Sequence, residues 1–214
     1  LPICDQIAKG LREAPYAYLI PQQQRDPAAA VEMLRRLAFS GVRVSQLTSP
    51  VAAEGETFPA GTWVVPMDQA FAAVAREVLD VQKYPDIRES PGGALETPYD
   101  AAGWTLPISM GVRTVTVTQP LDASARARMK PLGPAYDPAA PPTPYNSASA
   151  IDAAPFDSAP GVGFDASAVA KAIVPPAGRI TGTGPALAVN PAENNAFKAM
   201  NRAWRAGRSE EHTS

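Results

Sequence analysis

The chain has 214 residues, of which 45% are apolar, an ordinary share for a globular protein with a buried core. Its net charge of −2 and pI near 5.5 exclude the electrostatic footprint of a nucleic-acid-binding protein, and no basic stretch of the kind that docks on membranes is present. The 24 prolines are more than twice the usual share of roughly 5% and cluster along the chain, so we expect part of it to be extended linker.

The first elements in chain order predict a strand–helix–strand unit. The apolar run 17–20, closed by Pro21, is typical of a buried strand. Asp26-Pro27 places a capping side chain and a proline at a helix start, and the helix is expected to end at Gly41. Residues 42–47 alternate with a period of two residues and predict a half-buried strand.

The next elements extend this unit to about residue 118. Residues 54–56 are a turn signal, and residues 62–65 predict the strand that closes a hairpin-like excursion. Asp68 is expected to cap a second helix that ends at about Gln82. The buried face of that helix should consist of apolar residues at helical spacing, namely Phe71, Val74 and Val78. After an irregular stretch, residues 112–118 are rich in β-branched side chains and predict another strand.

The second half of the chain begins with a segment rich in proline and alanine. Residues 119–165 are predicted to be a linker, because the proline cluster at 138–144 can neither pair in a sheet nor continue a helix. A short helix is expected around 166–172 and a strand at 186–189. Asn190-Pro191-Ala192-Glu193 is a helix start of capping-box type. The buried face of this last helix should comprise Phe197, Met200 and Trp204.

These elements predict the α/β class. We expect a small βαβ-type domain (β-α-β-β-α) in residues 1–118, the linker in 119–165, and the truncated start of a second α/β unit in 166–207. Residues 208–214 match the first-frame translation of a common sequencing adapter at every position, so we exclude them from the fold. Since the sequence also begins with Leu1, we expect it to be a fragment of a larger bacterial protein whose targeting signal, if any, lies elsewhere.

No catalytic or metal site is predicted within the chain. A catalytic zinc needs about three ligands, most often histidine, whereas the only histidine here is His212 in the adapter-like tail. A Ser-His-Asp triad fails for the same reason. Cys4, the single cysteine, is expected to be an inert thiol in a frayed terminus. The glycine-rich residues 178–184 lack the spacing and lysine of a phosphate-binding loop and predict a flexible turn.

Two weaker signals leave other functions open. Carboxylates on predicted loops are expected to be solvated, although an acid/base pair of the glycosidase type stays open among them; they are Glu54, Glu56, Asp86, Glu89 and Glu96. Trp63 is expected in the core. Trp104, with Tyr84 and Tyr99, is the candidate for lining a ligand groove.

Several segments are similar to a recurring region of large bacterial carboxypeptidase A-like zinc peptidases. They are residues 17–21 with 24–29, residues 34–44, Phe58-Pro59-Ala60-Gly61-Thr62-Trp63-Val64-Val65-Pro66, residues 81–86, and residues 98–112. The resemblance covers residues 13–118 and is looser over 179–207. It implies a secreted or periplasmic parent protein with one catalytic zinc ion in a domain upstream of this region.

None of that family's zinc ligands, its carboxylate-binding arginine or its general-base glutamate falls on this chain. The resemblance therefore implies an accessory region, inactive alone, whose partner is its own upstream catalytic domain. Two alternatives remain. One is a non-catalytic ligand-binding α/β module for peptidoglycan-type peptides or sugars. The other is a degenerate amidotransferase-like domain that begins in residues 179–207, where no cysteine nucleophile occurs.

Overall fold

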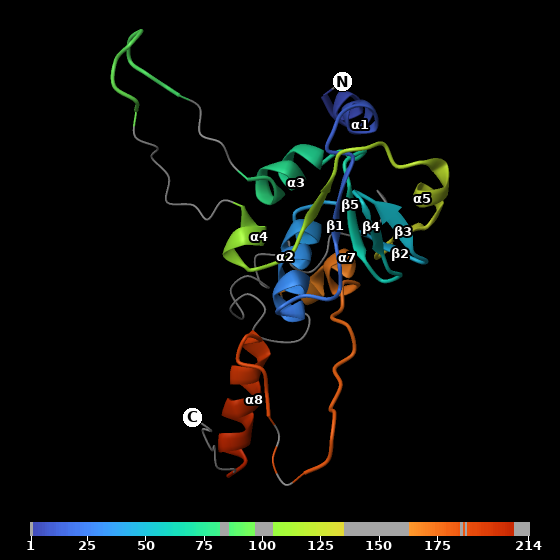
Figure 1. Ribbon diagram of the computed structural model, residues 1–214, viewed down its shortest axis with the longest axis vertical. Coiled ribbons are helices and arrows are strands. Elements are labelled where there is room, and N and C mark those ends of the chain that lie inside the picture. The colour runs from blue at the N-terminus through green and yellow to red at the C-terminus, as the bar shows by residue number, and fades with distance from the viewer. Residues whose placement is uncertain are drawn as a thin grey trace.

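A five-stranded antiparallel sheet with helices packed on it forms the centre of the fold (Figure 1). The computed structural model describes residues 2–81, 86–96, 105–134, 163–184, 186 and 188–207. The strand order across the sheet is β6 (Val115–Val117), β1 (Ala17–Ile20), β5 (Trp63–Pro66), β2 (Ser45–Leu47) and β7 (Met129–Pro131). Each neighbouring pair is antiparallel. The predicted α/β class is therefore confirmed.

The sheet separates two apolar clusters because side chains alternate between its faces along each strand. On β1, Tyr18 and Ile20 contribute to the larger cluster, whereas Ala17 and Leu19 contribute to the smaller one. The larger cluster includes residues of α2 (Pro27–Phe39), α3 (Ala72–Leu79), the 3₁₀ helix η2 (Gly163–Ala166) and α7 (Ala168–Lys171). The smaller cluster lies under the hairpin β3 (Val51–Ala53) and β4 (Glu56–Phe58) and the short helix α5 (Ala123–Ala127).

Helix α2 starts where the sequence predicts. One oxygen of the Asp26 side chain accepts hydrogen bonds from the backbone N–H groups of Ala28 and Ala29, at 2.9 and 3.3 Å, and Pro27 is the first helical residue. After the helix, Gly41 adopts a φ of +91°, a left-handed conformation that suits glycine. These local signals therefore set both ends of the helix correctly.

The strand–helix–strand unit is split by a later strand. Strands β1 and β2 run in the same direction, because each is antiparallel to β5, which lies between them. Strand β2 is also shorter than the predicted 42–47, because only residues 45–47 pair with a neighbour, although Val42 and Val44 are buried as the alternation indicates. The hairpin excursion ending in a strand at residues 62–65 is confirmed by β3, β4 and β5.

Helix α3 packs through a different face from the one predicted. Phe71 and Val74 are 46% and 38% exposed, and the buried positions are Ala72, Ala75 and Leu79. The prediction started the helix at Asp68, but this side chain makes ion pairs elsewhere and the helix begins at Ala72. Ala72, Ala75 and Leu79 lie in the larger cluster, whereas Val78, the third predicted position, is only partly buried against it.

The N-terminal residues, expected to be frayed, form helix α1 (Pro2–Arg12). A Cβ atom added at Gly10 would lie 1.9 Å from the carbonyl oxygen of Met67, so the helix backbone rests directly on the end of β5. Glycine is unfavourable inside a helix in water, so Gly10 weakens the local preference of these residues for a helix. Close packing against the domain explains why the helix nevertheless forms.

Part of the predicted linker belongs to the sheet. Strand β7 lies inside residues 119–165 and pairs with β2, with Ser45 opposite Pro131 and Leu47 opposite Met129. Phe164, Ala170 and Ile173 then join the cluster around α2. One side of an edge strand has no neighbouring strand, so a proline there removes no hydrogen bond of the ladder. A Pro-rich segment can therefore supply a strand at this position.

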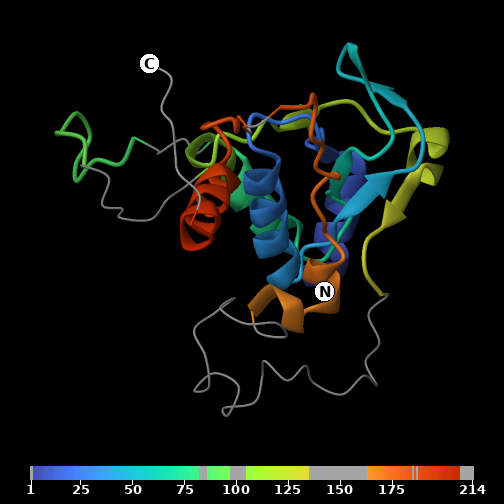
Figure 2. The same cartoon turned by 90° about the horizontal axis from the view of Figure 1, so that it is seen from below.

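The last described segment contains helix α8 (Asn194–Arg205). It begins after the predicted start, because Asn190 forms a turn in which its side chain accepts from the Ala192 N–H. The residues described at 186, 188 and 189 form no strand. With no sheet beside it, α8 packs on α2 (Figure 2) and buries only Ala196. Phe197 and Trp204 of its predicted buried face are each 53% exposed.

Candidate functional site

A hollow lies where the end of α3, the short helix α4 (Leu106–Ser109) and strand β6 meet. Its volume is about 500 Å³, within the range of small-molecule sites. Leu79, Pro107 and Ile108 supply apolar lining, and Asp80 and Thr114 are among the polar groups. We call this space the α3–α4–β6 hollow.

Asp80 connects the hollow to the core. Its Oδ1 accepts a hydrogen bond of 2.7 Å from the hydroxyl of Tyr18, and its Oδ2 pairs with Nε of Arg76 at 3.1 Å. Its backbone carbonyl accepts from the Thr105 hydroxyl at 3.0 Å. Burial raises the pKa of Tyr18 far above its ordinary value, and the hydrogen bond to Asp80 raises it further. Tyr18 is therefore a neutral donor that fixes the carboxylate.

Two threonines of the hollow are unusual, one in its backbone conformation and one in its hydrogen bonding. Thr105 adopts a φ of +55°, which residues other than glycine rarely do. The hydroxyl oxygen of Thr114 is buried and has no hydrogen-bond partner in the described part of the chain. A buried hydroxyl without a partner loses its hydration without compensation, so Thr114 carries a local cost in stability beside the hollow.

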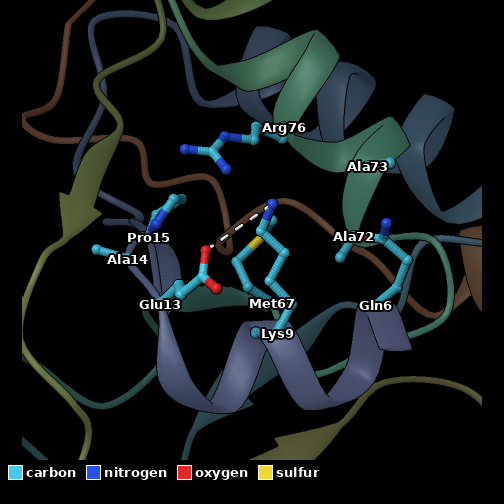
Figure 3. A pocket seen from close by; sticks show the side chains of 10 residues that line it. Gln6, Lys9, Glu13, Ala14, Pro15, Met67, Ala72, Ala73 and Arg76 are labelled. Atoms are coloured by element: carbon cyan, nitrogen blue, oxygen red, sulfur yellow. Dashed lines mark ion pairs between the residues drawn. The ribbon is translucent and has the colours of Figure 1, made fainter. Parts of the chain in front are cut away.

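A second, smaller pocket lies between α1 and α3 (Figure 3). Its volume is about 170 Å³, below the usual range for ligand sites. Lys9 of α1 and Glu13, which directly follows this helix, form an ion pair of 3.8 Å at its edge, and Arg76 of α3 extends across it. Since Arg76 is paired with Asp80 and Lys9 with Glu13, this pocket is a packing defect between two helices with compensated charge.

The carboxylates expected on loops are not brought together as an acid/base pair. Glu54 accepts hydrogen bonds from the backbone N–H and hydroxyl of Thr118 and from the N–H of Gln119. These bonds hold the pKa of Glu54 below its usual value. Glu56 instead forms an ion pair with Arg113 at 2.5 Å. The remaining members of that set are exposed, and they are Asp86, Glu89 and Glu96.

The other residues singled out from the sequence lie in the core, on the surface or outside the described residues. Trp63 is fully buried, as predicted, and Cys4 is exposed on α1. Residues 178–184 are exposed and contain neither helix nor strand. Trp104, Tyr84, Tyr99 and His212 lie outside the described residues.

Sequence reasoning missed the polar contacts that organise the domain, because they join residues far apart in the chain. Tyr18 and Asp80 are 62 positions apart, and Arg126 pairs with Asp68 from 58 positions away at 2.8 Å. One signal was present: an acidic residue at the C-terminal end of a helix opposes the helix dipole, so Asp80 needed a specific partner.

The fold and its hollow define a small α/β domain with polar side chains fixed at one corner of the sheet. No protein-family model, curated protein or solved structure matches the chain. Within the described ranges, no group of three or more His, Cys, Asp or Glu side chains is arranged to hold a metal ion. None of the helices in those same ranges has the length and apolar character that crossing a bilayer requires.

Proposed function

We propose that the chain is a non-catalytic accessory α/β domain of a bacterial carboxypeptidase A-like zinc peptidase, which removes C-terminal residues from peptides. The family assignment rests on the resemblance of residues 13–118. Under this proposal, the catalytic domain lies upstream, holds the single zinc ion, and is the packing partner of the present domain. The parent protein is secreted or periplasmic.

The non-catalytic role is supported by three aspartates whose two carboxylate oxygens both accept from protein donors. Asp26 accepts from backbone donors of two helices, Asp68 lies between Arg43 and Arg126, and Asp80 lies between Tyr18 and Arg76. Each of these side chains has a structural role, because both of its oxygens accept from protein donors that hold helices and loops in place. This engagement supports a role for the described carboxylates in building the domain.

The proposal is tested by expressing this chain beside the longer protein recovered with its upstream coding sequence. Metal analysis should find about one zinc per longer protein and none bound stoichiometrically to this chain. Hydrolysis of peptides from the C-terminus should require the upstream domain. Tight stoichiometric zinc binding by this chain, or an upstream sequence without a His-x-x-Glu motif, contradicts the proposal.

A second candidate function, binding of a small ligand, is favoured by the α3–α4–β6 hollow and its mixed apolar and polar lining. Peptidoglycan-type peptides and sugars are the ligand classes to test by calorimetry. Replacing Ile108, a 68% exposed residue of the apolar lining, by aspartate should weaken such binding without unfolding the chain. Ile180→Asp is the matched control, because Ile180 is 76% exposed and does not line the hollow.

A further inference from the structure

The two outer strands of the sheet differ in what they offer at their free edges. Directly after β7, the N–H of Leu132 donates to the Val44 carbonyl at 2.9 Å. Because residues of an antiparallel ladder face their neighbour alternately, Met129 and Pro131 of β7 are turned away from β2. Pro131 has no N–H, and a proline at an outward-facing position hinders the addition of a further strand. The β7 edge is therefore closed.

Strand β6 turns two threonines outward instead. Ala17 of β1 lies opposite Pro66, which has no N–H, so Ala17 does not exchange hydrogen bonds with β5 and faces β6. Its partner on β6 is Val117, so the odd-numbered residues of β6 face β1. The backbone N–H and C=O groups of Thr114 and Thr116 therefore face away from β1. Within the described part of the chain, no further strand lies beside this edge.

Side-chain contacts hold β6 extended at both ends. Before the strand, the Gln24 side chain accepts from the Arg113 N–H at 2.8 Å and donates to the Arg113 carbonyl at 3.0 Å. After the strand, Glu54 accepts from the Thr118 N–H at 2.7 Å. A surface that already has its binding conformation loses less conformational entropy when a partner binds. The open edge between these two contacts is therefore pre-organised for pairing.

This open edge lies beside the α3–α4–β6 hollow, and β6 is the yellow-green strand that follows α4 in Figure 1. Thr114 and Thr116 both line the hollow. Opposite residues of an antiparallel pair project their side chains to the same face of the sheet. A strand added at β6 would therefore direct the two side chains opposite these threonines toward the hollow.

The hollow favours uncharged side chains. The two charged residues of its described lining are Asp80 and Arg113. Asp80 is already paired with Arg76 at 3.1 Å, and Arg113 is paired with Glu56 at 2.5 Å. A charged side chain that entered the hollow would lose hydration without finding an unpaired counter-charge. An apolar side chain would instead contact the apolar part of the lining, which α3 and α4 supply.

A partner strand must therefore carry apolar side chains at alternate positions. A second copy of β6 does not, because it would direct its own Thr114 and Thr116 toward the hollow. We propose that β6 pairs in antiparallel fashion with an extended L-peptide whose alternate side chains are large and apolar, and that two of them enter the hollow. The inference deepens the second candidate function, on which it rests, by naming an extended peptide as the ligand. It does not depend on the parent family.

Calorimetry of the full chain with the peptide acetyl-Lys-Thr-Leu-Thr-Leu-Thr-Lys-amide tests the proposal. One peptide should bind per chain, with saturation below about 1 mM. Methylating the backbone nitrogens of both leucines removes the donors that face β6, so it should weaken binding about 10-fold or more. Methylating the nitrogen of the central threonine is the matched control. That N–H faces away from β6, so binding should stay within about twofold.

Variants of the chain test the same contact from the protein side. Thr116→Pro removes the outward-facing N–H and leaves the ladder with β1 intact, so it should keep the circular dichroism spectrum and weaken binding about 10-fold or more. Thr116→Val retains the N–H and is the control, with affinity close to that of the natural chain. Ile108→Asp should weaken binding through the hollow. If Thr116→Pro does not fold, the methylated peptides decide the question.

Three results overturn the proposal. One is the absence of saturable binding at about 1 mM peptide, and another is equal binding of the leucine-methylated peptide. The third is a dimer of the chain that Thr116→Pro dissociates, because the edge then belongs to a second copy. Peptidoglycan-type peptides or sugars might bind where this L-peptide does not, with Ile108→Asp weakening them. That outcome overturns strand addition and retains the second candidate function, whereas binding of neither ligand class contradicts both.

Discussion

Asp26 and Asn194 lie 168 positions apart, and one carboxylate oxygen of Asp26 accepts both the backbone N–H of Asn194 at 3.0 Å and its side-chain amide at 2.9 Å. The other oxygen caps α2. The positive ends of two helix dipoles therefore meet at one carboxylate that is only 6% exposed. This arrangement makes a single residue responsible for starting α2 and for attaching α8.

Substitutions at Asp26 should separate these two roles. Asp26→Ala removes both caps and should lower the free energy of unfolding by about 1–2 kcal/mol. Asp26→Asn retains a good cap for α2 but turns an amide donor toward the donors of Asn194, so it should release α8 with a smaller loss of stability. Urea unfolding and amide hydrogen exchange measure the two effects. Unchanged exchange at Asn194 in Asp26→Asn contradicts this division of roles.

Replacing Gly10 by alanine should destabilise the domain, although alanine favours a helix by about 1 kcal/mol over glycine. The new Cβ would meet the Met67 carbonyl at 1.9 Å, so α1 must move off the end of β5. Overpacking of this kind costs about 1–3 kcal/mol. Denaturant unfolding and proteolysis of the N-terminal residues provide the measurement. Leu11→Ala is the control, because Leu11 is exposed on the same helix. If Gly10→Ala stabilises the protein, α1 does not pack on Met67 as described.

Stability at alkaline pH should depend on Tyr18. Its pKa is raised in the folded protein relative to the ordinary value of 10.0, so the unfolded chain loses the phenolic proton first. The stabilisation is fully present below pH 10.0 and declines as the pH rises above that value, by up to about 1.4 kcal/mol per pH unit. Tyr18→Phe should show a shallower decline. Unfolding free energies measured on both sides of this pH decide the point, and equal slopes in the two proteins refute it.

Glu54 should show the opposite pH behaviour. Hydrogen bonds from Thr118 and Gln119 hold its pKa below 4.5, so its contribution to stability is present above that pH and is lost as the pH falls through the lower folded value. Nuclear magnetic resonance titration of the Thr118 amide should have a midpoint below 4.5, and Glu54→Gln should remove the transition. A midpoint at or above 4.5 would mean that the carboxylate is not held by these donors.

The parts of the fold that the sequence predicted are those with local causes. Strand β1 is an apolar run ended by Pro21, and α2 begins at a capping aspartate followed by proline. The faces of α3 and α8 were predicted wrongly, because apolar spacing alone does not reveal whether a partner surface exists. Phe197 and Trp204 would be core residues beside a sheet, but they are exposed beside a single helix.

The site was less predictable than the fold. Asp80, Tyr18 and Thr114 come together only because β1, α3 and β6 become neighbours, and no local spacing encodes that arrangement. The same holds for β5, which separates β1 from β2 although all three strands were expected individually. The family resemblance and the accessory role remain predictions, and the zinc content of the longer protein is the measurement that decides them.

The strand order has a consequence during synthesis. The three inner strands of the sheet are complete once residue 66 has been made, whereas both outer strands come later, at residues 115–117 and 129–131. Until β6 is made, a nascent chain of this protein has unpaired backbone groups along both sides of its sheet, and other nascent chains can pair with them. The β2 side stays open longest, until Pro131 has left the exit tunnel and β7 can pair with it.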